Sequence, residues 1–223
     1  MVREIELLKN VPIFSGISDK EIGLVTSILR KRSFPKSSVV IHKGDEGEAL
    51  YIILSGKVKV TLISDAGKEI ILAILREGNF FGEMSLLNNE PTSANVVTAE
   101  DSVFLTIYRD DFNYILRKDP GIALNLLKHM SLRLKIADKK IGSLALLDVC
   151  GRIANLFIDM AKEEKHEIYI VEKITHAEIA HMIGSTREVV SRAIKCLKDS
   201  GYIKVLRDKI ILDKDLKLKI DDF

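Results

Sequence analysis

Residues 174–203 read ITHAEIAHMIGSTREVVSRAIKCLKDSGYI and carry the strongest structural signal in the chain. Thr175 and Glu178 have the spacing of a capping box, which predicts a helix that begins there and buries the apolar residues that follow. Gly184 then allows a tight turn with positive φ. Segment 185–188 has the same capping-box spacing and predicts a second helix directly after the turn. Two short helices joined in this way are typical of a helix-turn-helix.

The second of these helices is amphipathic. At about 100° per residue, its polar side chains fall on one face and its apolar side chains on the other. Residues 185–209 hold seven basic and three acidic residues, a net charge of +4, although the whole chain carries only +2. An arginine at such a helix start can bond guanine, and a glutamate can accept from cytosine. The local positive charge predicts that this helix reads double-stranded DNA.

The segments around these helices complete a domain. Residues 148–161 have the pattern of an amphipathic helix, and 168–171 form a short apolar run that predicts a strand. Residues 202–205 and 210–212 predict a hairpin. Three helices followed by a hairpin are typical of a winged helix-turn-helix, which we expect over residues 146–223.

The first half of the chain has a different texture. Between residues 33 and 108, short β-branched and aromatic runs alternate with glycines at a spacing of roughly ten residues. This pattern predicts an antiparallel sandwich or barrel. Before it, residues 18–21 offer an N-cap with an acidic first turn and predict a short helix. We therefore expect an α+β chain whose first domain is a β-roll over residues 1–118. The predicted strands lie at 39–41, 50–54, 58–63, 70–75, 80–81, 96–97 and 103–107.

Asp119 and Pro120 predict the start of a long helix, because proline is tolerated in the first turn and aspartate can cap it. Apolar residues then recur at alternating intervals of three and four, which is the spacing of a heptad seam. Charged neighbours keep this stripe narrow, as in a two-helix seam, although packing on its own domain is the alternative. We expect a dimerisation helix over residues 119–145 and a parallel homodimer. The seam residues are Leu127, Met130, Leu134, Ala137, Ile141 and Leu144.

The composition excludes several classes. A length of 223 residues fits one large or two modest domains, and 34 basic against 32 acidic residues excludes a tail-driven polycation. Two cysteines, Cys150 and Cys196, cannot build a disulfide framework, and we expect both to be core residues. No apolar run is long enough to span a bilayer and no leader pattern occurs, so the expected location is the cytoplasm.

An enzyme is the competing class. The nearest candidate pairs are Glu83 with His42 and Asp148 with His166, and neither has the spacing of a catalytic motif. No nucleophile elbow, P-loop or metal-binding histidine pair occurs. The sequence therefore predicts a protein that is not an enzyme. A β-roll that controls a partner protein, with the helix-turn-helix as an interaction module, is a third possibility.

Three motifs, in the same order, resemble the family of the cyclic-AMP receptor protein and the fumarate-nitrate regulator (Crp/Fnr), which are bacterial transcription factors. Residues 174–203 resemble the family helix-turn-helix, residues 144–154 its hinge and first DNA-domain helix, and residues 81–94 the phosphate-binding cassette of its β-roll. The resemblance covers nearly the whole chain. It implies a homodimer that reads an inverted repeat and contacts RNA polymerase, either as an activator or as a repressor.

On the DNA side, the resemblance implies base contacts by Arg187, Glu188 and Arg192 and a phosphate contact by Thr186. Arg187 resembles the cyclic-AMP branch and Ser191 the fumarate-nitrate branch, so both TGTGA-like and TTGAT-like half-sites stay open. The candidate DNA-binding residues are Thr175, Ser185, Thr186, Arg187, Glu188, Ser191, Arg192 and Lys195.

The effector side departs from the family pattern. Cyclic-AMP binders carry an arginine where this chain has Thr92, and each charge-assisted hydrogen bond so lost is worth roughly 1.5–3 kcal/mol. A buried or half-buried Asp138 would in addition repel a phosphate. These differences disfavour cyclic AMP. The expected pocket residues are Gly82, Glu83, Met84, Ser85, Thr92, Ser93, Ala137 and Asp138.

Other cofactors of the family find little support in this sequence. Its two cysteines cannot hold a cluster that needs four, so an iron–sulfur cluster is excluded. Haem bound through His42 or His129 is a further alternative. The effector stays unidentified, and a regulator without an effector, controlled by its own abundance, is also compatible with the sequence.

Overall fold

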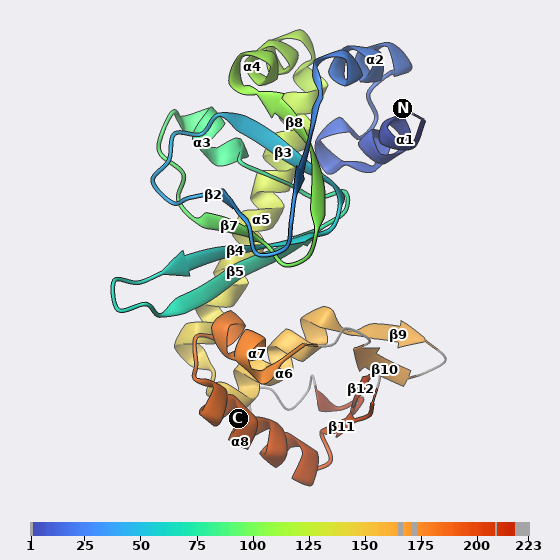
Figure 1. Cartoon of the computed structure of the whole chain (residues 1–223). Coiled ribbons are helices and arrows are strands. Elements are labelled where there is room, and N and C mark those ends of the chain that lie inside the picture. The colour runs from blue at the N-terminus through green and yellow to red at the C-terminus, as the bar shows by residue number, and fades with distance from the viewer. Residues whose placement is uncertain (1, 165–166, 171–173, 208, 217–223) are drawn as a thin grey trace. The chain divides into compact units, whose positions relative to one another are not determined.

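The computed structural model of the chain describes residues 2–164, 167–170, 174–207 and 209–216. The chain divides into two compact units, Met1–Leu134 and Lys135–Phe223. The division falls inside one long helix, α5 (Pro120–Leu146), so each unit contains a part of it (Figure 1). His166 and Val171, which belong to a predicted catalytic pair and a predicted strand, lie outside the described residues.

The first unit begins with three short helical elements: α1 (Val2–Asn10), η1 (Pro12–Phe14) and α2 (Asp19–Ile28). At the start of α2, the Glu21 amide donates to the Ser18 hydroxyl at 3.3 Å, and the Ser18 amide donates to the Glu21 carboxylate at 2.6 Å. The predicted N-cap is therefore confirmed, and Glu21 completes a capping box, which satisfies amides that would otherwise lack partners at the helix start.

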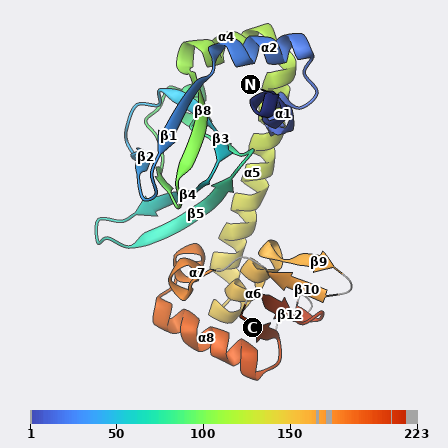
Figure 2. The same ribbon diagram turned by 45° about the vertical axis from the view of Figure 1, so that its right-hand side comes forward.

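Two four-stranded antiparallel sheets form the β-roll (Figure 2). The first has the order β1 (Arg30–Phe34), β8 (Ser102–Tyr108), β3 (Ala49–Ser55) and β6 (Phe80–Phe81). The second has the order β2 (Val39–Ile41), β7 (Asn95–Thr98), β4 (Lys57–Ile63) and β5 (Glu69–Arg76). The predicted roll is confirmed. Most of β1 escaped prediction, because its sequence RKRSF has one apolar residue and no alternating pattern.

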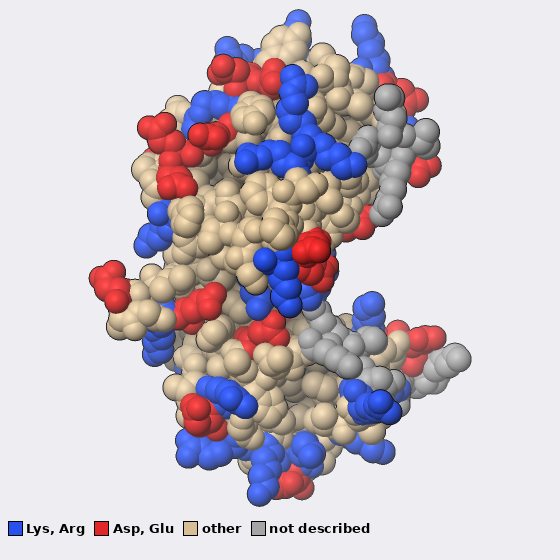
Figure 3. Space-filling model, in the orientation of Figure 1, with Lys and Arg blue, Asp and Glu red and all other residues tan. Residues whose placement is uncertain are grey.

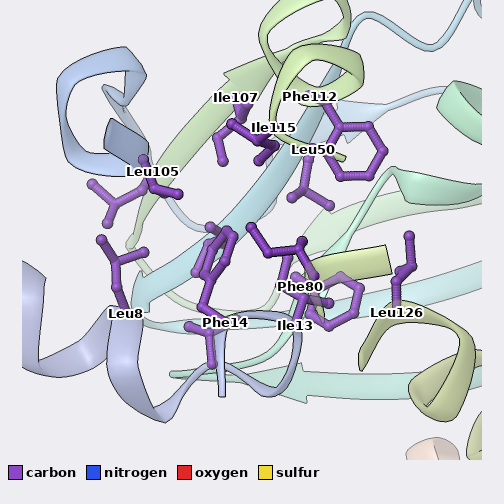
Figure 4. Close-up of a cluster of buried hydrophobic side chains, with 14 of the residues drawn as sticks. Leu8, Ile13, Phe14, Leu50, Phe80, Leu105, Ile107, Phe112, Ile115 and Leu126 are labelled. Carbon is purple, nitrogen blue, oxygen red and sulfur yellow. The ribbon is translucent and has the colours of Figure 1, made fainter. Parts of the chain in front are cut away.

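The main core of this unit lies where the N-terminal helices and the sheet of β3 and β8 meet two further helices (Figure 4). Leu8 and Phe14 from the N-terminal elements pack with Leu50 of β3 and with Phe112 of α4 (Arg109–Lys118). Leu126 of α5 packs against the same cluster. The start of the long helix is thus anchored by apolar burial, the main stabilising term in folding.

Helix α5 begins at the predicted place, and the Asp119 carboxylate accepts a hydrogen bond from the Gly121 amide at 2.8 Å. The seam is largely unpaired in the single chain: Leu127, Leu134 and Ile141 are 66%, 63% and 64% exposed. Ala137 is exposed, Leu144 is half-buried, and Met130 packs partly against the core of the first unit. Ile122 and Leu126, rather than the seam, bury themselves in that unit.

The second unit is a winged helix-turn-helix. Its core contains Ile153, Phe157, Ile179, Val190 and Leu197. Its sheet has the order β11, β12, β10, β9. Strand β9 was not predicted, because its sequence KEE is polar. The elements are α6 (Val149–Met160), β9 (Lys162–Glu164), β10 (Glu167–Ile170), α7 (His176–Ile183), α8 (Arg187–Asp199), β11 (Ile203–Val205) and β12 (Ile210–Leu212).

Two local predictions in this unit are wrong. The residue that caps α8 is Thr186, whose hydroxyl accepts from the Val189 amide at 3.4 Å; the Ser185 amide instead donates to the Ala180 carbonyl. The third helical residue is then Val189, which cannot complete a capping box. Cys196 is exposed, so the expectation that it is a core residue is wrong, whereas Cys150 is half-buried and packs against the core of this unit.

Candidate functional site

The helix-turn-helix is held by the local contacts that its sequence predicts. The Glu178 amide donates to the Thr175 hydroxyl at 3.1 Å, and the Thr175 amide donates to the Glu178 carboxylate at 3.0 Å. Gly184 ends α7 with a φ of 66°, in the left-handed region that glycine adopts without a steric penalty. Helix α8 therefore starts two residues after the turn.

Helix α8 separates its side chains into two faces. Val190, Ala193, Ile194 and Leu197 are buried, whereas the predicted DNA-reading side chains are exposed. Hydrogen bonds from its own backbone amide and from the Thr186 hydroxyl lower the pKa of Glu188, so it is an ionised acceptor at neutral pH. Basic side chains gather over α8 in Figure 3. The exposed predicted residues of this face are Arg187, Glu188, Arg192 and Lys195.

Ser191 occupies a different environment from these residues. It is half-buried, and its hydroxyl donates to the Arg187 carbonyl at 2.9 Å and lies 2.8 Å from Nδ1 of His176. His176 is the first residue of α7, so this contact joins the two helices of the motif. The hydroxyl of Thr175 is likewise committed to its helix cap, and Ser185 is half-buried at the turn.

The wing adds exposed basic side chains beside this face. Lys204 and Arg207 are exposed on and after β11. The ammonium of Lys209 lies 5.1 Å from the centre of the Tyr169 ring, a cation–π contact that links the hairpin to β10. The wing therefore presents positive charge on a fixed scaffold.

In the β-roll, the candidate effector site begins at α3 (Glu83–Asn88). Gly82 precedes it with a φ of 90°, and a Cβ atom there would lie 2.5 Å from the Ala49 carbonyl oxygen, so only glycine fits. Ser85 is buried, and its hydroxyl donates to the Gly82 carbonyl at 3.2 Å. Gly47 approaches Ser85 so closely that a side chain there would collide with its hydroxyl. The residues of the cassette are thus closely packed against the backbone at Gly47 and Ala49.

Glu83 is the distinctive residue of this cassette. It is 1% exposed, and its Oε1 accepts from Nη1 of Arg133 at 2.6 Å. Its other oxygen, Oε2, is buried without a hydrogen-bond partner among the described residues. Burial raises the pKa of the Glu83 carboxyl, and the charge of Arg133 opposes that shift. A buried acceptor without a partner carries a desolvation cost, which a hydrogen-bond donor placed beside it would relieve.

The environment of Thr92 supports the expected departure from the family pattern. Its side chain is buried, and its hydroxyl donates to the His42 carbonyl at 2.5 Å. Its backbone exchanges hydrogen bonds with Gly44 and Asp45 at 2.8 and 2.9 Å. The residue at the expected phosphate position is therefore uncharged, and its hydroxyl is engaged with the loop after β2.

The remaining predicted pocket residues are more scattered. Met84 and Ser93 are exposed. Ala137 and Asp138 lie in the part of α5 that belongs to the second unit, and both are exposed in the single chain. The supposition that Asp138 is buried or half-buried is thus wrong for the single chain, so the argument that a buried carboxylate would repel a phosphate loses its basis.

Arg133 and Arg109 are site residues that the sequence did not reveal as such. Arg109, the first residue of α4, donates to the Gly47 carbonyl at 2.5 Å and to Oδ1 of Asn89 at 2.6 Å. It thereby ties the end of α3 to the loop before β3. Arg133 looked only like a charged neighbour of the seam. Both pair with residues far away in the chain, so no local spacing could have identified them.

His129, a candidate haem ligand, lies beside Phe80. Its ring centre is 4.5 Å from that of Phe80, and Nδ1 is buried without a partner among the described residues. Burial, followed by the charge of Arg133, lowers the pKa of this histidine. His42, the other candidate, has an exposed side chain. No group of three or more histidine, cysteine or acidic side chains suited to a metal ion occurs among the described residues.

A β-roll with a closely packed cassette after β6, followed by a long helix and a winged helix-turn-helix, defines a class of DNA-binding transcription regulators. Comparison with protein families agrees: residues 31–119 match the cyclic nucleotide-binding domain and residues 151–218 the Crp-like helix-turn-helix domain. In the described part of the chain, no helix is both long and apolar enough to cross a membrane.

Two curated relatives extend over most of the chain. The cyclic AMP receptor protein of Thermus thermophilus is 32% identical over 198 residues, which are 89% of this chain and 90% of the relative. The cAMP-activated global transcriptional regulator CRP of Salmonella typhimurium is 34% identical over 183 residues, 80% of this chain and 87% of the relative. The chain therefore belongs to the Crp/Fnr family of transcription regulators, whose members are not enzymes.

Solved structures show the same architecture. The catabolite activator protein of Thermus thermophilus has a TM-score of 0.56 and 30% identity and covers 95% of this chain and 98% of its own. A mutant of CooA from Carboxydothermus hydrogenoformans has a TM-score of 0.76 and 26% identity, with 90% and 89% covered. These similarities agree with the assignment of a β-roll, a long helix and a DNA-binding domain.

Proposed function

We propose that this regulator is a homodimer that reads an inverted repeat in double-stranded DNA, and that a small hydroxyl-bearing effector binds in its β-roll. The observation that carries the effector proposal is Oε2 of Glu83, which is buried and has no hydrogen-bond partner among the described residues. The DNA proposal rests on the exposed basic face of α8 and the exposed basic residues of the wing.

The exposed seam of α5 supports the dimer. Leu127, Leu134 and Ile141 follow one another at intervals of seven and are each more than half exposed in the single chain. Apolar residues at this period pack knobs-into-holes against a second helix. A copy of the same helix would cover the stripe and place two recognition helices on successive half-sites of a palindromic operator.

For DNA reading, we assign base contacts to Arg187, Glu188 and Arg192 and phosphate contacts to Thr186 and Lys195. Their exposure on α8 supports this division, since arginine and glutamate can reach base edges in the major groove. Ser191 instead contributes to the joint between α7 and α8 through His176. This engagement favours the TGTGA-like half-site over one in which the serine reads a base.

For the effector, we propose a ligand whose hydroxyl donates to Oε2 of Glu83. The relatives are named for cyclic AMP, so this nucleotide is the first ligand to test. Thr92, however, offers no charge to a phosphate and already donates to the His42 carbonyl. We therefore expect cyclic AMP to bind weakly, and a ligand held mainly through hydroxyl groups to bind better.

The location and the downstream partner follow from the same family relationship. We propose that the protein acts in the cytoplasm, where it has access to chromosomal DNA. The DNA-bound dimer would regulate transcription through contact with RNA polymerase. The names of the relatives as transcriptional regulators support this part of the proposal.

The test is selection of DNA from a random pool with purified protein at one fixed salt concentration, with and without cyclic AMP. An inverted repeat enriched equally in both arms would support DNA reading and the argument from Thr92. Enrichment only with cyclic AMP would contradict the expectation, drawn from Thr92, that cyclic AMP binds weakly. An Arg187→Ala, Arg192→Ala double variant is the control, and it should lose the enriched site. If the double variant recovers the same site, base reading by α8 is wrong.

A further inference from the structure

His176 of α7 contacts Ser191 of α8 in the DNA-binding unit. Nδ1 of the His176 ring lies 2.8 Å from the Ser191 hydroxyl oxygen, and the same oxygen lies 2.9 Å from the Arg187 carbonyl oxygen. His176 is exposed and Ser191 is half-buried, so this contact lies at the surface of the helix-turn-helix. The two residues are 15 positions apart in the chain, and their contact joins the first turn of α7 to the second turn of α8.

The two contacts together decide which atom carries each proton. A serine hydroxyl has one hydrogen, and a carbonyl oxygen can only accept. The Ser191 hydroxyl therefore donates its hydrogen to the Arg187 carbonyl, and Nδ1 of His176 donates to the Ser191 oxygen. It follows that Nδ1 of His176 carries a proton. The neutral imidazole is then the Nδ1–H tautomer, in which Nε2 holds the lone pair.

Ser191 stands where a side chain could read DNA. It lies one helical turn beyond Arg187, and residues four apart share a face of a helix. A serine hydroxyl can bond to several different base edges in the major groove. To turn toward a base, however, the Ser191 hydroxyl must give up the Arg187 carbonyl and leave the His176 N–H without its acceptor. The imidazole therefore adds to the cost of a base contact by this serine.

We propose that His176 is a positioning residue that determines the base preference of α8, because it holds the Ser191 hydroxyl away from the bases. This inference rests on the proposed DNA reading by α8. Without the imidazole, the hydroxyl can change its rotamer at a lower cost, so the protein should accept an additional base at the position that faces the second turn of α8. The start of α7 does not depend on the imidazole, since Thr175 and Glu178 form its capping box.

The first experiment repeats the DNA selection with full-length variants at one fixed salt concentration. In His176→Ala, the ratio of the preferred base to the others should change by about three- to tenfold at one position of each half-site, the effect of one net hydrogen bond. His176→Asn, whose amide nitrogen is as far along the side chain as Nδ1, should keep the wild-type preference. His176→Gln, whose nitrogen corresponds to Nε2, should behave like His176→Ala. An unchanged preference in His176→Ala, or rescue by glutamine instead of asparagine, would overturn the proposal.

A second pair of variants tests whether His176 acts through the serine. In the Ser191→Ala background, His176→Ala should leave the base preference unchanged, because no hydroxyl is left to release. An equal change in both backgrounds would indicate a direct contact between His176 and DNA. An equal loss of affinity for all sequences would indicate a merely structural role. Either result would overturn the proposal.

The second experiment observes the hydrogen bond without DNA. Nitrogen-15 spectra of the full-length protein with labelled histidine, recorded above the pH range in which imidazole titrates, distinguish a protonated Nδ1 from a protonated Nε2. The signal that is missing in His176→Asn identifies His176. We expect the Nδ1–H form in the wild type and a shift toward Nε2–H in Ser191→Ala, whereas Nε2–H in the wild type would overturn the proposal. If the wild type selects no operator, the proposed DNA reading fails and the positioning role fails with it, but the spectra still decide the hydrogen bond.

Discussion

Arg133 of the long helix is bonded to Glu83 at the start of α3. Nη1 of Arg133 donates to Oε1 of Glu83 at 2.6 Å, and Nη2 donates to the Phe80 carbonyl at 2.5 Å. The guanidinium also lies 5.0 Å from the centre of the Phe80 ring. A ligand group bound to Oε2 of Glu83 would therefore contact a residue that is itself bonded to Arg133 of α5, the helix that carries the seam.

We predict that Arg133→Met destabilises the protein by about 2–3 kcal/mol. The change leaves the Glu83 carboxylate buried without its counter-charge, and the cost is below that of a fully buried pair because Arg133 is partly exposed. Urea unfolding measures the effect. The double variant Arg133→Met, Glu83→Gln should recover part of the lost free energy, since it removes the unpaired charge. If the double variant instead loses the sum of the free energies that the two single variants lose, the two side chains are not directly coupled.

Glu83 also predicts a pH dependence. Its folded-state pKa lies above the ordinary value of 4.5, mainly because of burial. The native state then holds this proton to a higher pH than the unfolded chain does, so its contribution to stability falls as the pH rises from 4.5 through the folded pKa. Relative to Glu83→Gln, the wild type should lose stability over this interval and then level off. Denaturant unfolding of both proteins between about pH 4 and 8 tests this, and parallel curves would contradict it.

Replacement of Thr92 tests the assignment of the phosphate position. Thr92→Arg should increase the affinity for cyclic AMP by about tenfold or more, because a charge-assisted hydrogen bond to a phosphate contributes roughly 1.5–3 kcal/mol. Thr92→Ser, which keeps a hydroxyl for the His42 carbonyl, should bind cyclic AMP as weakly as the wild type. Isothermal titration calorimetry measures both. Tight binding of cyclic AMP by the wild type would refute the assignment.

The exposed residues of α8 should separate into two kinds by their effect on DNA binding. Arg187→Ala or Arg192→Ala should cost roughly 1–3 kcal/mol on the selected operator and relax the base preference. Lys195→Ala should weaken binding to all sequences equally and reduce the salt slope by about one. Fluorescence anisotropy across a salt series distinguishes these effects. A uniform loss on all sequences from the arginine changes would count against base reading.

The seam offers a matched pair of variants for the dimer. Leu134→Asp places a charge on the heptad stripe and should convert the dimer to monomers, because a buried unpaired charge is costly. Leu132→Asp changes a residue of similar exposure, 54% against 63%, that lies off the stripe, and should leave the dimer intact. Sedimentation equilibrium measures the mass. Dissociation by both variants, or by neither, would place the dimer interface elsewhere.

The sequence by itself determined the features that depend on neighbouring residues. The N-cap at Ser18, the capping box at Thr175, the turn at Gly184 and the start of α5 at Pro120 all formed as predicted, because their contacts span only a few residues. The one capping box that failed, at 185–188, failed because the Ser185 amide bonds to the preceding helix instead.

Tertiary structure alone decided which distant groups become partners. Arg133 and Glu83 are 50 residues apart in the chain, and Arg109 and Gly47 are 62 residues apart. Whether a charged or reactive group is buried, paired or exposed depends on the packing of separate segments against one another. The residue spacing that predicts helices and strands holds no information about these contacts, so the class of protein could be inferred from sequence but the partners of its site could not.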